Sequence, residues 1–146
     1  MKIFLGADHG GFEIKEQIKE YLTNRGRDEV TDLGSTQLDE GDDYVDYAVM
    51  VARELEGDSQ ARGLLFCRNG MGMVITANRF SGVRCGFGFD SEAVKRGRTD
   101  DDINCLAIPA DYLDVSAVRD IVDAFLSNDF SDEERYTRRI SKLSEI

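Results

Sequence analysis

Five short apolar runs, separated by stretches of helical period, constrain the fold of this chain more than any other feature. The runs are residues 2–6, 29–33, 63–66, 83–87 and 104–108. Between them, apolar residues recur at three- and four-residue steps, as they do on one face of a helix. Strands that alternate with helices are typical of a parallel sheet covered by helices. The sequence therefore predicts an α/β fold with a five-stranded parallel sheet.

The helical stretches have recognisable limits. We expect helices over residues 12–22, 44–55, 74–78, 115–126 and 133–143. Gly26 suits the end of the first helix, and Pro109 suits a turn after the fifth strand. The acidic residues 39–43 indicate a solvated loop whose charge can also cap the helix that begins near Tyr44. Their spacing does not match a calcium loop, so a metal site there has no support.

Length, charge and cysteine content exclude several classes of protein. The 146 residues, 41% of them apolar, fit one domain over residues 1–146. A net charge of -11 argues against nucleic-acid and anionic-membrane partners, since both require a basic surface. Polar residues follow the first strand at once, so we expect neither a signal peptide nor a membrane span. Three cysteines spaced for neither zinc nor disulfides indicate the reducing cytoplasm.

The segment from Cys67 to Met73 is the strongest indication of chemistry. It has the order of a strand end, a glycine-containing loop and a helix start. Glycines there leave backbone N–H groups free for an anion, and a cation such as Arg68 favours a thiolate. Taken alone, Cys67 would be a small buried residue, which is our interpretation of Cys85 and Cys105. The loop and its arginine favour a functional thiol.

Polar residues that follow three different strands should meet at one edge of the sheet. Asp8 and His9 follow the first strand, Cys67 follows the third and Asp90 the fourth. Parallel strands end at a common edge, where α/β proteins bind their ligands. His9 is the only histidine, and both a structural and a functional role are open for it. An anionic substrate would need a local group of cations, which the tail supplies as Arg135, Arg138 and Arg139.

Several of these motifs, in this order, resemble the family of ribose-5-phosphate isomerase B and galactose-6-phosphate isomerase. The resemblance covers nearly the whole chain, and its carriers are residues 6–15, 43–48, 67–73, 77–79, 82–84, 102–104 and 135–140. It implies a Rossmann-like, three-layer α/β/α subunit that forms a homodimer or higher oligomer, with each site at the subunit interface. It also implies aldose–ketose isomerisation of a phosphorylated sugar, without metal or cofactor.

The resemblance implies that Cys67 carries the central proton transfer. Its thiolate would remove the proton next to the carbonyl and return it to the neighbouring carbon. Backbone N–H groups would hold the negative oxygen of the enediolate intermediate, each worth on the order of 3 kcal/mol in the transition state. These groups belong to Gly70, Met71, Gly72, Met73 and Val74. Asn69 would occupy the polar position two residues after the thiol.

Further roles follow from the same resemblance. Asp8 and His9 would contact the sugar hydroxyls, and Tyr44 would line the pocket. Arg135 and Arg139 would bind the phosphate, a task that suits the planar fork of arginine. The tail arginines could instead be helix-surface charges that balance neighbouring glutamates.

Three places depart from the family pattern. The loop before the fifth strand usually carries a His-Asn pair, whose histidine assists ring opening, but here Asp100 and Asp101 would face the substrate. An arginine usual after the fifth strand is Asp111, and a tail histidine is Tyr136. A carboxylate near a phosphate repels it by roughly 1 kcal/mol or more. These changes place ordinary ribose 5-phosphate turnover in question, although Arg68, usually a glycine, could compensate.

Three functions are open on these grounds. The first is an isomerase with Cys67 as base, using either a protonated Asp100 as ring-opening acid or an open substrate such as a tetrose 4-phosphate. The second is a non-catalytic sugar-phosphate-binding subunit of a hetero-oligomeric isomerase, which Asp100 and Asp111 favour but the retained Cys67 opposes. The third is a flavin-binding or receiver domain, although the chain lacks the phosphate loop of the former and the paired acids of the latter.

Overall fold

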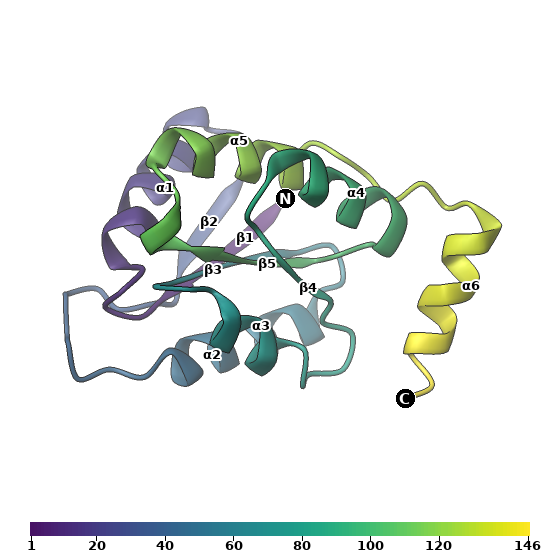
Figure 1. Ribbon diagram of the computed structural model, residues 1–146, viewed down its shortest axis with the longest axis horizontal. Coiled ribbons are helices and arrows are strands. Elements are labelled where there is room, and N and C mark those ends of the chain that lie inside the picture. Colours follow the sequence, from purple (N-terminus) through teal and green to yellow (C-terminus); the bar gives the residue numbers. More distant parts are fainter.

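The computed structural model describes residues 1–146 and confirms an α/β fold around one parallel sheet (Figure 1). The strands are β1 (Lys2–Ala7), β2 (Glu29–Asp32), β3 (Arg62–Cys67), β4 (Cys85–Phe87) and β5 (Cys105–Pro109). Their order across the sheet is β2-β1-β3-β5-β4. The chain therefore runs from β1 toward one edge of the sheet and from β3 toward the other. Such a change of direction opens a crevice at the carboxyl ends of the strands.

Helices cover both faces of the sheet and complete the predicted three layers (Figure 1). One face carries α1 (Phe12–Arg25), α4 (Ser91–Asp101) and α5 (Val115–Leu126). The other carries α2 (Tyr44–Gly57) and α3 (Met71–Ala77). A short 3-10 turn, η1 (Ala110–Tyr112), follows β5, and α6 (Glu134–Leu143) stands apart from the sheet beyond α4. No helix is both long enough and apolar enough to span a bilayer.

Alternation along the strands divides the core in two, because successive side chains point to opposite faces of a sheet. In β3, Leu64 and Phe66 pack with α1 and α5, whereas Leu65 and Cys67 pack with α2 and α3. All four side chains are buried. The register of β3 thus directs the Cys67 thiol to the face on which α3 begins.

The helix α4 was not predicted, and the segment assigned to a loop before the fifth strand forms its last turn. Only Val94 and Arg98 of this helix are buried, so it lacks the apolar period that reveals the other helices. Its start is fixed by Asp90, whose side chain accepts a hydrogen bond from the Ala93 N–H at 2.9 Å. Asp90 is therefore a helix cap. The predicted limit of the first helix is confirmed, since Gly26 follows α1 at φ 62°.

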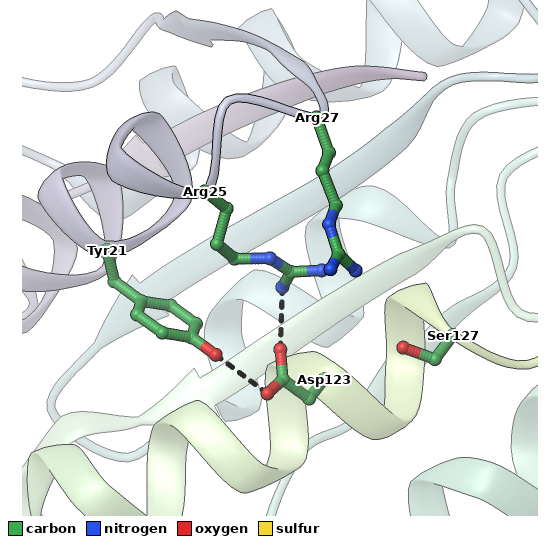
Figure 2. Close-up of a pocket in the computed structure, with 5 residues that line it drawn as sticks. All are labelled: Tyr21, Arg25, Arg27, Asp123 and Ser127. Carbon is green, nitrogen blue, oxygen red and sulfur yellow. Dashed lines mark hydrogen bonds and ion pairs between the residues drawn. The ribbon is translucent and has the colours of Figure 1, made fainter.

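Polar contacts join α1 to α5 at the end of the sheet opposite Cys67. Figure 2 shows Tyr21 and Arg25 directed at the carboxylate of Asp123. The hydroxyl of Tyr21 donates to Asp123 at 2.7 Å, and the Arg25 guanidinium lies 2.6 Å from its other oxygen. These residues, with Arg27 and Ser127, line a cavity of about 340 Å³. Because α1 ends shortly before β2 begins, this cavity lies at the amino-terminal edge of the strands.

Candidate active site

The loops that follow β1 and β3 lie side by side, as the sequence predicts. Ala7 pairs with Phe66 and Cys67 pairs with Pro109, so β1, β3 and β5 end at the same edge. Asp8 lies at this edge, directly after the last residue of β1. Its charge acts on the thiol of Cys67 and on the ring of His9. The structure therefore brings together the predicted residues Asp8, His9 and Cys67.

Cys67 is buried, and backbone geometry holds its sulfur. Its Sγ accepts a hydrogen bond from the Gly70 N–H at 3.1 Å. Gly70 adopts φ 76°, and a Cβ there would lie 2.7 Å from the Phe87 ring, so the tight turn requires glycine. Burial raises the pKa of the Cys67 thiol; the Gly70 N–H opposes this effect, and the charge of Asp8 adds to it. The resting group is the neutral thiol, and the thiolate that the loop was expected to favour must be formed at the start of the reaction.

The predicted anion hole is narrower than residues 70–74. The Gly70 N–H is used by the sulfur, the Met71 N–H donates to Asn69 Oδ1 at 3.0 Å, and the Val74 N–H donates to the Gly70 carbonyl at 3.1 Å. Gly72 and Met73 begin the helix with no backbone acceptor, but the Met73 N–H is directed at the Cys67 sulfur, where it lowers the pKa of the thiol. The Gly72 N–H is therefore the donor left for a substrate oxygen. Asn69 acts within the loop as the acceptor that shapes it.

Asp8 is a buried carboxyl with a fixed orientation. Its Oδ1 accepts a hydrogen bond from the Gly11 N–H at 3.1 Å. A Cβ on Gly11 would lie 2.3 Å from the backbone of Phe66, so glycine is required where α1 approaches β3. Burial raises the pKa of Asp8, against the lowering effects of the Gly11 N–H and the His9 charge. A carboxyl with a raised pKa is better suited than an exposed one to exchange a proton with a sugar hydroxyl.

His9 is held by Asp42, a residue that sequence reasoning placed in a solvated loop. His9 Nδ1 lies 2.7 Å from Asp42 Oδ1, and the His9 backbone N–H donates to the same oxygen at 3.0 Å. The Asp42 side chain is only 7% exposed, so the solvated-loop prediction is wrong at this residue. Burial would raise the pKa of Asp42, but hydrogen bonds from the His9 backbone and ring and from Tyr47 outweigh burial and lower it. Asp42 is therefore a carboxylate.

Tyr44 lies against the start of α3. It is the first residue of α2, and a Cβ on Gly72 would lie 2.5 Å from its ring. Beside the loop is a largely apolar cavity of about 420 Å³, lined by Asn69, Met71, Phe87, Phe89, Pro109, Tyr112 and Leu113. Several of these side chains are exposed, among them Tyr112 at 76%. The structure thus places Tyr44, Asn69 and Met71 around the site.

Asp100 and Asp101 lie at the opposite edge of the sheet. They end α4, and the chain then enters β5 at Cys105, whereas Cys67 pairs with the last residue of β5. Five residues of strand separate the two positions by roughly 13 Å. Asp100 accepts a hydrogen bond from Thr99 at 2.8 Å. Within one chain, Asp100 and Asp101 therefore lie far from Cys67, and the role that the resemblance implies for them requires a second subunit.

The predicted phosphate ligands Arg135 and Arg139 are also remote from Cys67 in the same chain. Both belong to α6, which packs only near α4 (Figure 1). Their guanidinium groups lie 4.4 and 5.6 Å from the centre of the Tyr136 ring. Arg135 also pairs with Glu133 at 2.9 Å, as the alternative of helix-surface charge predicts. Arg139 has no carboxylate within ion-pair distance.

Comparison with known proteins identifies the family. The sequence pattern described as Ribose/Galactose Isomerase matches residues 3–143. The chain belongs to this family. Ribose-5-phosphate isomerase B of Mycobacterium leprae is 32% identical over 146 residues, which are 100% of this chain and 90% of that protein. These matches confirm the resemblance drawn from the motifs.

Solved structures of family members share the fold. The crystal structure of ribose 5-phosphate isomerase from Thermotoga maritima has a TM-score of 0.94 and 36% identity, and covers 99% of this chain and 98% of its own. The ribose-5-phosphate isomerase B of Mycoplasma genitalium, with ribulose 5-phosphate bound, has a TM-score of 0.94 and 32% identity, and covers 99% and 94%. The Rossmann-like, three-layer architecture is therefore that of the family.

Two departures from the family pattern meet in space. Arg68, in place of a glycine, lies 3.6 Å from Asp111, in place of an arginine. The Asp111 N–H also donates to the Arg68 carbonyl at 3.0 Å, which joins the loop after β3 to η1. The stem of Arg68 passes over Gly10, where a Cβ would lie 2.4 Å from its Cγ. Compared with the family pattern, the cation of this pair therefore lies on the loop after β3 and the other partner is a carboxylate.

Proposed function

We propose that this chain is an aldose–ketose isomerase of a small phosphorylated sugar, with Cys67 as the base. The observation that carries the proposal is the thiol of Cys67 at the strand edge, beside the free Gly72 N–H group and the carboxyl of Asp8. The family supports it, because relatives over the full length are named ribose-5-phosphate isomerase B. The solved relative with bound ribulose 5-phosphate supports a pentose 5-phosphate as the substrate class.

The geometry supports a proton transfer through an enediolate. Cys67, once ionised, takes the proton from C2 of the open aldose and returns it to C1 of the ketose. The carboxyl of Asp8 is suited to move the accompanying proton between O1 and O2. The N–H group of Gly72 would stabilise the negative oxygen by on the order of 3 kcal/mol. Water is limited at the sulfur because Cys67 is buried.

The alternative of a non-catalytic binding subunit depends on Asp100 and on Asp111, and it loses the second of these supports. It requires Asp111 to be a negative charge that faces the phosphate. Asp111 instead pairs with Arg68, so the pair as a whole adds no net negative charge. Arg68, whose side chain is 63% exposed, also offers a cation on the same chain as Cys67.

Isomerisation in D₂O tests the proposal. Ribose 5-phosphate and erythrose 4-phosphate are incubated with the protein, and proton NMR follows ketose formation. We expect deuterium at C1 of the ketose, because an enediolate exchanges its transferred proton with solvent. Conversion without any deuterium would exclude a solvent-exchanging enediolate, and the absence of conversion with both sugars would leave binding as the function.

We propose further that two copies of the chain form each site. Cys67 and the anion-binding candidates of α6 lie at different ends of one subunit, so a second copy must supply Arg135 and Arg139 if they bind the phosphate. Exposed apolar side chains beside the site, Met71, Phe89 and Tyr112, supply a surface for such a contact. The free state of all three cysteines is in keeping with a cytoplasmic enzyme.

Complementation between inactive variants tests the shared site. Cys67→Ala and Arg139→Ala proteins are each expected to be impaired. A 1:1 mixture that is unfolded and refolded together should recover about a quarter of the wild-type activity, because half of the dimers contain one intact site out of two. The result is read as initial rate beside light scattering of each sample. A monomer in solution, or a mixture no more active than its components, would show that one chain forms the whole site.

A further inference from the structure

The His9–Asp42 pair has a chemical role that the isomerisation step does not use. His9 Nδ1 faces Asp42 Oδ1 at 2.7 Å, and Asp42 is ionised, so the neutral ring carries its proton on Nδ1. Nε2 is then a bare lone pair. It has no hydrogen-bond partner in the protein, and the side chain is 24% exposed at the edge of the site.

The placement of this nitrogen matters because sugar phosphates of five carbons are closed rings in water. Cys67 can remove the C2 proton only next to a free carbonyl, so the ring must open first. Opening moves one proton from the O1 hydroxyl to the ring oxygen. Both oxygens are bonded to C1, so one base can reach each in turn.

We propose that His9 opens the sugar ring and that Asp42 is the positioning residue that presents Nε2 for this step. Nε2 takes the proton from O1 as the C1–O1 bond becomes a carbonyl. The C1–O4 bond breaks, and the ring oxygen leaves with its electron pair and takes the proton back from Nε2. No net charge or proton is left on the enzyme. The proposal rests on the proposed function, since ring opening matters only for a cyclic substrate.

Burial of Asp42 fits a positioning role better than a surface contact. Its side chain is only 7% exposed, and its Oδ1 accepts hydrogen bonds from both the His9 backbone N–H and the ring Nδ1–H. The double contact fixes the ring orientation as well as the tautomer. The transient imidazolium is stabilised by the adjacent carboxylate.

The other candidate for this step, Asp100, lies far from Cys67 in the same chain, and a second copy would have to bring it to the site. Asp100, offered by the sequence as a ring-opening acid, accepts from Thr99 and lies against the Tyr136 hydroxyl. It joins α4 to α6 at the far edge of the sheet. His9 is on the same edge as Cys67 and is the only histidine of the chain.

Ring opening can be measured apart from isomerisation, as exchange between the α and β anomers of ribose 5-phosphate. Exchange NMR spectroscopy at C1 is recorded with the full-length Cys67→Ala protein. We expect catalysed exchange to persist in this variant. It should fall to the rate in buffer when His9→Asn or Asp42→Asn is added. Asp39→Asn is the matched control, because Asp39 lies in the same loop but bonds only to Gly41, at 3.0 Å.

A kinetic measurement with Cys67 intact completes the test. Asp42→Asn should lower kcat for ribose 5-phosphate by about 10²-fold with KM little changed, as expected for loss of acid–base catalysis. If anomer exchange is absent with Cys67→Ala, or if Asp42→Asn and Asp39→Asn behave alike, the proposal is overturned. Should Asp42→Asn not fold, His9→Asn decides the question through the same exchange rate. Failure of the wild type to isomerise any sugar phosphate would instead contradict the proposed function, and anomer exchange would still report on His9.

Discussion

Cys67→Ala is expected to lower kcat for the aldose phosphate by about 10³-fold, because alanine leaves no group that can take the C2 proton. Burial of the sulfur raises the pKa of the Cys67 thiol, despite the opposing Gly70 N–H. The wild-type rate should therefore increase as pH rises above neutral and the thiolate forms. Initial rates of ketose formation between roughly pH 6 and roughly pH 10, a range that spans the ordinary thiol pKa, measure both effects.

Cys85→Ala is the matched control for this change. Cys85 is also a buried free thiol, but it begins β4 and packs in the core beside Cys105. Its loss should leave kcat within a small factor of wild type. A Cys67→Ala enzyme that retains most of its activity, or a wild-type rate independent of pH, would remove Cys67 from the role of base.

Asp32→Asn is expected to lower the free energy of unfolding by about 3 kcal/mol, because it leaves a buried lysine without its main counter-charge. Lys15 is wholly buried in α1, and its Nζ lies 2.9 and 2.8 Å from the two oxygens of Asp32. It also donates to the Ser35 carbonyl at 2.7 Å. The pair anchors α1 to the end of β2. Urea unfolding at neutral pH measures the change.

The same pair predicts a pH dependence of stability. Burial would raise the pKa of Asp32, but hydrogen bonds from Lys15 and Lys19 outweigh burial and lower it below the unfolded value. The stabilisation is therefore complete above the unfolded pKa of about 3.9 and is lost as pH falls through the folded pKa. Asp32→Asn should remove this part of the acid sensitivity. Glu92→Gln, at exposed ion pairs with Lys95 and Arg96, is the control and should change little.

A double variant distinguishes the loss of the Lys15–Asp32 ion pair from the loss of packing around Asp32. If Lys15 is destabilising once unpaired, Lys15→Met should recover part of the stability lost in Asp32→Asn. No recovery would mean that the loss comes from packing around Asp32. Equal urea midpoints for wild type and Asp32→Asn would contradict a role for this pair in stability.

The fold was largely predictable because its signals are local. Each strand is an apolar run, and most helices show apolar residues at steps of three to four. Both patterns can be recognised within a single short segment. The helix α4 escaped because its buried residues are a single valine and a charged arginine, Arg98. Arg98 is buried through contacts with Asp102 and the Asn128 carbonyl. No residue pattern within the α4 segment predicts these contacts.

The positions of candidate site residues were predictable where these residues follow strand ends. The prediction failed for Asp42, whose contact is with a residue on a different loop. Asp8, His9 and Cys67 could be placed together because parallel strands end at one edge. The sequence offered no sign that Asp42 would leave its acidic loop for the ring of His9, 33 residues away. It also could not show that Asp100 and Arg139 end on the far side of the subunit from the thiol.

By itself, the sequence determined the α/β class, the family and the loop that holds the thiol. Each of these depends on short contiguous segments, whose apolar periodicity or glycine content can be recognised without knowing the rest of the fold. Only the tertiary structure decided the pairing of Arg68 with Asp111, the burial of Asp42 against His9 and the direction of the pKa shift of Cys67, which burial raises. These features depend on distances between loops and on the loss of water around charges. Neither quantity exists until the chain has packed.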